Sequence, residues 1–196
     1  MIHAQRHHEQ TVLDLIGRCF RDDPQFFAYT QGHPAKIRLI ARLIFETCLA
    51  SNTIFLTDDL NAVALCKPGG KPRISLRVLW LQFLFPFVLG PRLLMRLMRI
   101  EHALEKQRQL QTNDLYVWLL ATHPAQQGKG LASQLLAQIS QRMPSPYSAI
   151  VLETSTASNR DYYTKRGYQG YHTIDFDHDL SIFMMRKTIQ SEHVSH

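Results

Sequence analysis

Apolar residues recur along the chain with two periods, one typical of helices and one typical of strands. The helical period predicts helices at residues 9–20 and 35–50 and a further helix that begins near Gly130. Short apolar runs between turn-forming residues predict strands at residues 53–57, 61–67, 115–122, 150–154, 168–177 and 182–188. Helices and strands in this mixed order predict an α/β fold.

A segment at about residues 68–113, rich in Leu, Phe and Arg, is predicted to be helical. Its most apolar part, residues 78–89, contains Gln82 and Pro86 and falls short of the roughly 20 residues that span a bilayer. Further along, leucines form a helical stripe, and Arg92, Arg96 and Arg99 lie opposite it. Three roles stay open: a cap over a pocket, a surface that meets a partner subunit or a membrane, and a helix pair packed on the sheet.

The stretch LYVWLLATHPAQQGKGLA, residues 115–132, combines an apolar strand, a proline stop and a glycine loop that opens a helix. Gly128 and Gly130 lack Cβ atoms, so the backbone can approach a ligand closely and turn its amides toward it. The positive end of the helix dipole adds to this, and the loop is predicted to bind an anion. It is not a nucleoside triphosphate loop, because Lys129 is followed by Gly130 rather than by Ser or Thr.

Gln127, Gly130 and Ala132 fit the pattern Q/R-x-x-G-x-G/A, which resembles the acyl-CoA pyrophosphate loop of the GCN5-related N-acetyltransferase (GNAT) superfamily. The resemblance implies acetyl-CoA as the cofactor. It also implies that the backbone of Leu120, Ala121 and Thr122 runs beside the pantetheine. The amides that would hold the pyrophosphate belong to Gln127, Gly128, Lys129, Gly130, Leu131 and Ala132. The alternative is an ordinary strand, turn and helix.

A second motif, IVLETSTASNRDYYTKRGY at residues 150–168, resembles the later acyl-CoA segment of the same superfamily. Asn159 and Tyr162 stand where the resemblance implies cofactor contacts. The phrase LETS, followed by Asn159 and the Tyr162–Tyr163 pair, most closely resembles puromycin N-acetyltransferase-like members.

Tyr163 stands at the tyrosine of the signature aromatic-Tyr-x-x-x-Gly-aromatic, and the resemblance makes it a candidate general acid. When an amine attacks a thioester, the departing thiolate needs a proton, which a nearby phenol can supply. The alternative is that Tyr163 only packs its ring on a neighbouring strand.

The GNAT resemblance implies a general base on the strand before the pyrophosphate loop, where many members have a Glu. The strand at residues 115–122 holds no acidic residue, so Glu153 is the candidate instead. The acceptor amine must lose a proton before it attacks. A carboxylate in an apolar strand is costly unless it faces a cleft or is paired. The alternative is a structural Glu bonded to backbone or to an arginine. Direct transfer is expected, with no acyl-enzyme.

The resemblance places one wall of the acceptor site at the end of the first helix and in the loop that follows it. The candidate substrate contacts there are Phe20, Asp23, Phe26, Phe27 and Tyr29. Aromatic residues near a helix end are also common in a core, and this alternative stays open.

The resemblance implies a GNAT-like acyl-CoA N-acyltransferase fold with a central twisted, mostly antiparallel sheet and helices on both faces. One parallel pair of strands, ending near Thr122 and Thr154, should splay to admit the acyl chain. The C-terminal strands should join at residues 178–180. With 196 residues, 45% of them apolar, we expect a single domain over residues 1–196 with a helical insertion at about 68–113.

Composition excludes several function classes. The 22 basic and 16 acidic residues give a net charge of +6, but no recognition helix or aromatic and basic strand points to nucleic acid. Cys19, Cys48 and Cys66 sit among apolar residues, and no Cys or His spacing predicts a metal site. The N-terminal sequence has no signal-peptide pattern, so a cytoplasmic, reducing location is expected.

The sequence therefore predicts an acetyl-CoA-dependent N-acetyltransferase that acts on a primary amine of a small molecule. Two alternatives stay open, a non-catalytic acyl-CoA-binding or sensor module and a protein or peptide N-acetyltransferase. A homodimer or surface contact through the apolar insertion is a further expectation. The identity of the amine and the length of the acyl group are left open.

Overall fold

The computed structural model describes residues 1–70, 74–142, 147–176 and 180–189. Its strands are β1 (Ile2–His3), β2 (Ile54–Leu56), β3 (Ala62–Pro68), β4 (Asp114–Thr122), β5 (Ala149–Thr154), β6 (Gln169–Phe176) and β7 (Leu180–Thr188). Its α-helices are α1 (Glu9–Cys19), α2 (Pro24–Thr30), α3 (Pro34–Ala50), α4 (Leu76–Leu89), α5 (Pro91–Arg108), α6 (Leu131–Arg142) and α7 (Ala157–Thr164). Two short 3-10 turns are η1 (Arg6–His8) and η2 (Pro124–Gln126).

The described strands form one 7-stranded sheet in the order β1-β2-β3-β4-β5-β7-β6. β4 and β5 run parallel, and the other neighbouring pairs are antiparallel. This confirms the predicted α/β fold, with its mostly antiparallel sheet and one parallel pair.

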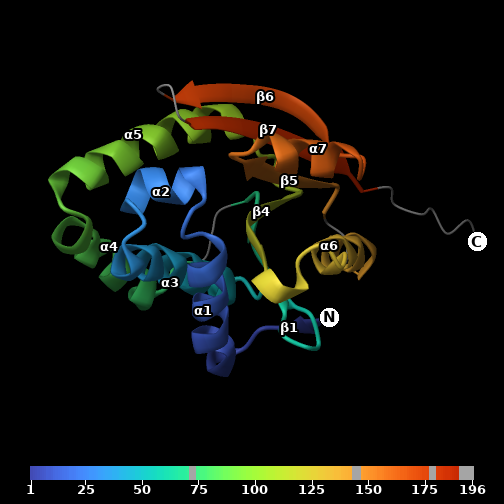
Figure 1. Ribbon diagram of the computed structural model, residues 1–196, viewed down its shortest axis with the longest axis horizontal. Helices are drawn as coiled ribbons and strands as arrows, with labels where there is room; N and C mark the ends of the chain where they lie inside the picture. Colours follow the sequence, from blue (N-terminus) through green and yellow to red (C-terminus); the bar gives the residue numbers. More distant parts are fainter. Residues whose placement is uncertain (71–73, 143–146, 177–179, 190–196) are drawn as a thin grey trace, which may run out of the picture.

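Helices cover both faces of the sheet (Figure 1). Side chains of β3 alternate between the faces, as a pleated strand requires. Val63 and Leu65 join the core beneath α1 to α5, and Ala62, Ala64 and Cys66 join the core beneath α6. The sheet therefore separates two apolar cores.

Besides the two 3-10 turns, one strand and one α-helix were not predicted from the sequence. β1 is only two residues long, too short for a period to show. α2 begins at Pro24 within a stretch expected to be a loop. There the Asp23 side chain caps the helix by accepting from the Phe26 amide, and Pro24 takes the first helical position. The same Asp-Pro pair also favours turns, which explains the error.

The segment at 68–113 forms the helices α4 and α5, joined at Gly90. The helical prediction is confirmed, and no described helix is long and apolar enough to cross a membrane. The expected junction at residues 178–180 lies outside the described residues except for Leu180, which begins β7.

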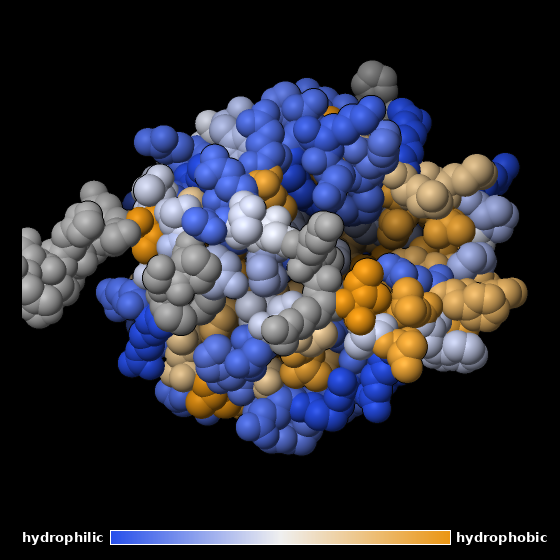
Figure 2. Space-filling model, turned by 180° about the vertical axis from the view of Figure 1, so that it is seen from behind, coloured by the Kyte–Doolittle hydropathy of each residue, from blue (hydrophilic) through white to orange (hydrophobic). Residues whose placement is uncertain are grey.

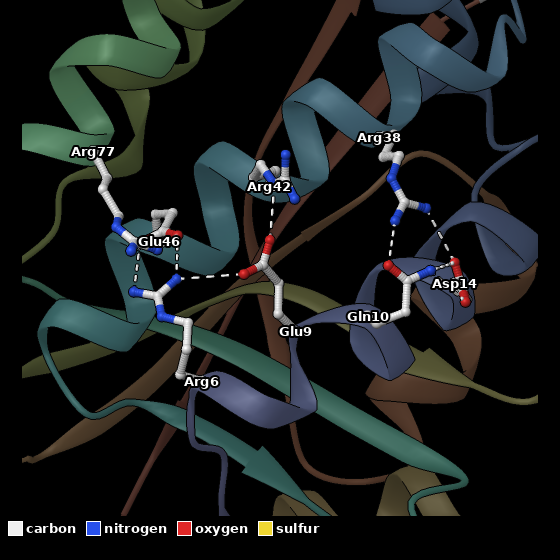
Figure 3. A network of polar contacts seen from close by, with 8 residues as sticks. All are labelled: Arg6, Glu9, Gln10, Asp14, Arg38, Arg42, Glu46 and Arg77. Carbon is white, nitrogen blue, oxygen red and sulfur yellow. Dashed lines mark hydrogen bonds and ion pairs between the residues drawn. The ribbon is translucent and has the colours of Figure 1, made fainter.

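An ion-pair network ties the N-terminal segment to α3 and α4 (Figure 3). Glu46 on α3 is buried and pairs with both terminal nitrogens of the Arg6 guanidinium, at 2.9 Å for Nη2 to Oε2. Arg77 on α4 approaches Glu46 Oε1 at 3.7 Å. Arg42 reaches Glu9 at 2.8 Å. The network holds α4 on α3 at its N-terminal end.

Glu46→Gln is expected to lower the free energy of unfolding by about 1–2 kcal/mol, because the buried partner of two arginines is lost. The value is moderate because the Arg6 and Arg77 side chains are 45% and 66% exposed and solvent screens the pair. Urea denaturation measures the change. Asp58→Asn, which removes an exposed ion pair to the N-terminus, is the matched control and should shift the midpoint little. Equal urea midpoints for Glu46→Gln and Asp58→Asn would contradict a stabilising role of the Glu46 ion pairs.

Candidate active site

The parallel strands β4 and β5 separate partway along their length. Their paired residues run from Asp114 and Ala149 to Val117 and Leu152. Beyond this point, β4 continues to Thr122 and β5 continues to Thr154. A cavity of about 180 Å³ opens beside the splayed ends. The structure therefore has the splay that the resemblance implied.

Side chains from both strands and five helices line the cavity. The strand residues are Tyr116, Val117, Trp118, Leu119, Leu120, Leu152, Glu153 and Thr154. The helices and loops contribute Phe20, Asp23, Gln25, Phe26, Tyr29, Ile40, Leu43, Ile44, Phe85, Leu97, Glu101, Ser155, Asn159 and Tyr163. Phe85 comes from α4, and Leu97 and Glu101 come from α5. The insertion thus closes one side of the cavity, and part of its apolar side chains pack into the core while others are exposed.

Glu153 is held in a buried ion pair. Arg108 Nε donates to Glu153 Oε1 at 2.6 Å and Arg108 Nη2 donates to Oε2 at 3.2 Å. The same guanidinium also reaches Glu101 and Glu105, each at 3.0 Å. Burial raises the pKa of the Glu153 carboxyl, and the charge of Arg108 opposes this rise. Glu153 therefore faces the cavity with both oxygens already engaged by an arginine.

Asp23 is the second carboxylate at the cavity, and its contacts differ. Its Oδ1 accepts from the Phe26 amide at 3.0 Å, and its Oδ2 accepts from Ser155 Oγ at 3.0 Å. Burial raises the pKa of Asp23, and these hydrogen bonds oppose the rise. Ser155 directly follows β5, so the pair joins the end of β5 to the start of α2.

A third carboxylate, Glu101, accepts from the Tyr29 hydroxyl at 2.8 Å, and Gln25 donates to that hydroxyl at 2.9 Å. Among the described residues, no lysine or arginine lines the cavity, and Arg108 lies behind Glu101 and Glu153. Three carboxylates and one arginine leave about two negative charges at the cavity. Such a site attracts a cation.

Tyr163 lines the cavity from α7. Its ring makes edge contacts with Tyr162 and Tyr168, at centroid distances of 5.2 Å and 5.5 Å. Burial raises the pKa of its phenol. The hydroxyl is thus protonated at neutral pH, as a proton donor requires.

The glycine loop has the backbone shape expected of an anion cradle. Gly128 and Gly130 both have φ of 80°, a left-handed conformation that favours glycine. A Cβ at either position would point into open space, so the loop leaves room beside its backbone. α6 begins directly after it at Leu131, and the first amides of a helix lack partners within it. These residues fit a pyrophosphate.

The end of β4 offers a further polar atom. The Thr122 hydroxyl is buried and has no hydrogen-bond partner among the described residues. The Thr122 carbonyl accepts from the Gln127 side chain at 3.3 Å. An unpartnered buried hydroxyl beside the splay suits a polar chain such as pantetheine.

Tyr162 connects α7 to α6. Its hydroxyl and Ser133 Oγ lie 2.5 Å apart, and Arg166 Nε donates to the same Ser133 oxygen at 2.6 Å. Arg166 also stacks over the Tyr162 ring at 3.5 Å from the centroid. Asn159, in the first turn of α7, lines the cavity. These contacts fix the position of α7, and with it Tyr163, relative to the glycine loop.

Four of the five predicted substrate contacts reach the cavity, namely Phe20, Asp23, Phe26 and Tyr29. Phe27 does not line it, and its side chain is exposed on the outer face of α2. The helical geometry of α2 explains the difference, since Phe26 and Phe27 are consecutive and point about 100° apart.

Several cavity residues were not singled out from the sequence. Ser155 belongs to the LETS phrase. Its place directly after a predicted strand, two residues from Glu153, could have indicated that it lies at the site. Arg108, Glu101 and Phe85 come from the insertion, where nothing in the sequence tells the cavity side from the other sides. Among the described residues, no group of three or more His, Cys, Asp or Glu could hold a metal ion.

Residues 103–189 match the sequence profile of the acetyltransferase (GNAT) domain. The sequence matches no curated protein at a significant level. Similar solved structures include "histone acetyltransferase HPA2 and related acetyltransferase" from Corynebacterium glutamicum, with 18% identity, a TM-score of 0.64 and coverage of 98% of this chain and 97% of that one.

Arylalkylamine N-acetyltransferase 2 from Aedes aegypti has 16% identity and a TM-score of 0.60, and the alignment covers 96% of this chain and 98% of that one. Agmatine N-acetyltransferase has 14% identity and a TM-score of 0.64, with coverage of 95% and 98%. At these identities the structures show a shared fold. Residues 103–189 thus carry a GNAT acetyltransferase domain, the described chain has the GNAT fold, and the enzyme class of the protein is acyltransferase.

Proposed function

We propose that the protein transfers an acetyl group from acetyl-CoA to the primary amine of a small cationic molecule with an apolar body. The observation that carries this proposal is the cavity in the β4–β5 splay, which combines carboxylates with aromatic walls. The carboxylates attract the ammonium group, and the aromatic and aliphatic side chains receive the rest of the molecule.

The size of the cavity supports a small acceptor. A cavity of about 150 Å³ is large enough for a benzene ring, and this one measures about 180 Å³. Phe20, Phe26 and Trp118 supply aromatic surfaces there. A compact amine with one aromatic ring or a short alkyl chain fits this space and these walls.

Asp23 is our proposed base. The ammonium must lose a proton, and within the described part of the chain Asp23 is the cavity carboxylate that forms no ion pair with an arginine. Ser155 lies between Asp23 and the end of β5, so its hydroxyl can take the amine proton as it gives its own to Asp23. Glu153, predicted from the sequence as the base, is the alternative. Its pairing with Arg108 stabilises the charged form and engages both carboxylate oxygens, which opposes the uptake of a proton.

When bound, acetyl-CoA supplies the acyl thioester whose carbonyl carbon the amine attacks. Leu120 and Thr122 of β4 and the amides from Gln127 to Ala132 are proposed to hold it, with Asn159 and Tyr162 as further contacts. Tyr163 holds a proton on its hydroxyl for the departing thiolate. The reaction needs no acyl-enzyme, so no cysteine is assigned a role.

Tyr163→Phe is expected to lower kcat about tenfold and to leave the KM for acetyl-CoA nearly unchanged. The loss is moderate because a thiolate is a fair leaving group, with a thiol pKa near 8.5. Steady-state release of CoA measures it. Tyr168→Phe, which alters a neighbouring phenol that does not line the cavity, is the matched control. Full activity of Tyr163→Phe at every pH would show that the ring only packs.

The acceptor class is tested with a panel of amines. Phenylethylamine and short alkylamines should be acetylated with higher kcat/KM than a lysine-containing peptide, because α4 and α5 close one side of the cavity. Efficient turnover of the peptide would favour protein acetylation instead. Binding of acetyl-CoA without transfer to any amine would favour a sensor.

The finer resemblance to puromycin N-acetyltransferase-like members rests on the LETS phrase, Asn159 and the Tyr162–Tyr163 pair, and it stays a prediction. A cytoplasmic location is also proposed. Cys19, Cys48 and Cys66 are free thiols, which suits a reducing compartment.

A further inference from the structure

α4 carries apolar side chains on two faces. The inner face, with Val78, Leu81, Phe85 and Leu89, is buried. The outer face is exposed and includes Trp80 at 62%, Phe83 at 59% and Phe87 at 73% of their full accessible area. Exposed aromatic residues in a contiguous row are unusual on a surface that meets only water.

The outer aromatic residues form one continuous row. Trp80 stacks on Phe83 with ring centroids 5.8 Å apart, and Phe83 contacts Phe87 at 5.4 Å. Further exposed apolar residues on α4 and α5 are Leu76, Leu79, Val88, Met95 and Met98. We call this set, with Trp80, Phe83 and Phe87, the outer patch. Figure 2 shows orange side chains gathered at the end of the molecule that α4 and α5 form.

The charged residues of α4, and those of α5 up to Ile100, are all arginines. Between Ile74 and Ile100 there is no Asp or Glu, and the charged residues are Arg77, Arg92, Arg96 and Arg99. Arg77 approaches Glu46, whereas Arg92, Arg96 and Arg99 lie exposed on α5 beside Met95 and Met98. The outer patch is thus an apolar surface bordered by positive charge.

We propose that the outer patch attaches the protein to the surface of an anionic phospholipid membrane. Aromatic and aliphatic side chains enter the boundary between headgroups and acyl chains, and arginines pair with anionic headgroups. A second copy of this chain fits less well, because a symmetric contact would bring the same arginines toward one another. The helices lie on the membrane and do not span it.

The two helices that carry the outer patch also line the cavity. Phe85 of α4 and Leu97 of α5 line the cavity, while their neighbours Phe83, Phe87 and Met98 point outward. One layer of helices therefore separates the proposed membrane face from the acceptor site. Apolar amines that partition into a membrane would be concentrated next to it.

The test is co-sedimentation of the full chain with vesicles of phosphatidylcholine alone and with vesicles that also contain phosphatidylglycerol. We expect binding to the anionic vesicles, weakened by salt. A blue shift of Trp80 emission should accompany it, read in a Trp118→Phe background because Trp118 is the other tryptophan. Phe83→Ser with Phe87→Ser should reduce partitioning at least about tenfold.

A charge-matched pair of triple variants tests the arginines. Arg92, Arg96 and Arg99, each changed to Gln, should reduce binding to anionic vesicles by roughly a hundredfold. The control triple variant removes the same net charge elsewhere, by changing Arg21, Arg142 and Lys165 to Gln. It should bind anionic vesicles as the wild type does. Unchanged calorimetric binding of acetyl-CoA shows that each variant is folded.

Three results would overturn the proposal. The wild type could bind anionic vesicles no better than neutral ones, or the two triple variants could lose binding equally. The protein could also elute as a dimer that Phe83→Ser with Phe87→Ser converts to a monomer, with no vesicle binding, which would make the outer patch an interface between two copies. Vesicle binding is independent of the acceptor and does not require the proposed reaction.

Discussion

Asp23→Asn is expected to lower kcat/KM for amine acetylation by about 10²- to 10⁴-fold, the usual contribution of a positioned base. Asn keeps the size of the side chain and an oxygen that can accept from the Phe26 amide, but it cannot take a proton from Ser155. Ser155→Ala removes the hydroxyl that relays the proton but leaves the Asp23 carboxylate, so its kcat/KM should fall less than that of Asp23→Asn. Release of CoA, followed at several pH values, measures both variants.

The stability of Asp23→Asn provides the control for folding. Because burial raises the pKa of Asp23, the folded protein binds this proton more tightly than the unfolded chain does. The ionised carboxyl therefore costs stability as the pH rises above its unfolded pKa of about 3.9. Asn has no such cost and remains a good helix cap. We expect the variant to be at least as stable as the wild type near neutral pH.

The pH profile gives the same assignment a second test. A base must be ionised, so kcat/KM should fall as the pH drops through the raised pKa of Asp23. The Asn variant should lose this acidic limb.

Glu153→Gln separates the two candidate bases. Removing one partner of a buried ion pair should lower stability by about 3 kcal/mol or more, because Arg108 loses its closest carboxylate. The remaining folded enzyme should keep most of its kcat. If Glu153→Gln instead abolishes turnover and Asp23→Asn does not, the base is Glu153, as the sequence predicted.

Gly130→Glu is expected to raise the Kd for acetyl-CoA by about a hundredfold, or about 2.7 kcal/mol, because it brings a carboxylate to the proposed pyrophosphate site. Gly130 has a φ of 80°, so any side chain there also strains the backbone. Gly130→Gln shares the strain and the size but not the charge.

Calorimetric titration should therefore find a smaller increase in the Kd for acetyl-CoA in Gly130→Gln than in Gly130→Glu. Added salt should reduce the difference in Kd between the two variants. Equal affinities for Gln and Glu would show that the loop does not hold the phosphates.

The parts of the fold with a clear period were predictable. α1, α3, β3, β4 and β5 have apolar faces of sufficient length, and the glycine loop between β4 and α6 follows from Gly128 and Gly130. α2 was missed because a seven-residue helix has too few turns to show a period, and its Asp-Pro start also favours a turn.

The site was only partly predictable, because a local sequence pattern does not show which residues far apart in the chain contact each other. Tyr163, Asn159 and Asp23, all singled out from the sequence, line the cavity. Arg108 lies 45 residues from Glu153 along the chain, and their contact depends on how α5 crosses the sheet. The same applies to Asp23 and Ser155, which are 132 residues apart. Such long-range pairs decide which cavity carboxylate is bound by an arginine and which by a serine.

The most direct test of the central proposal is to incubate the purified protein with acetyl-CoA and phenylethylamine and to detect CoA and the acetylated amine by mass spectrometry. We expect the wild type to form both products in equal amounts and Asp23→Asn to form much less of each. Tight binding of acetyl-CoA with no acetylated product from this or any other cationic amine would contradict it.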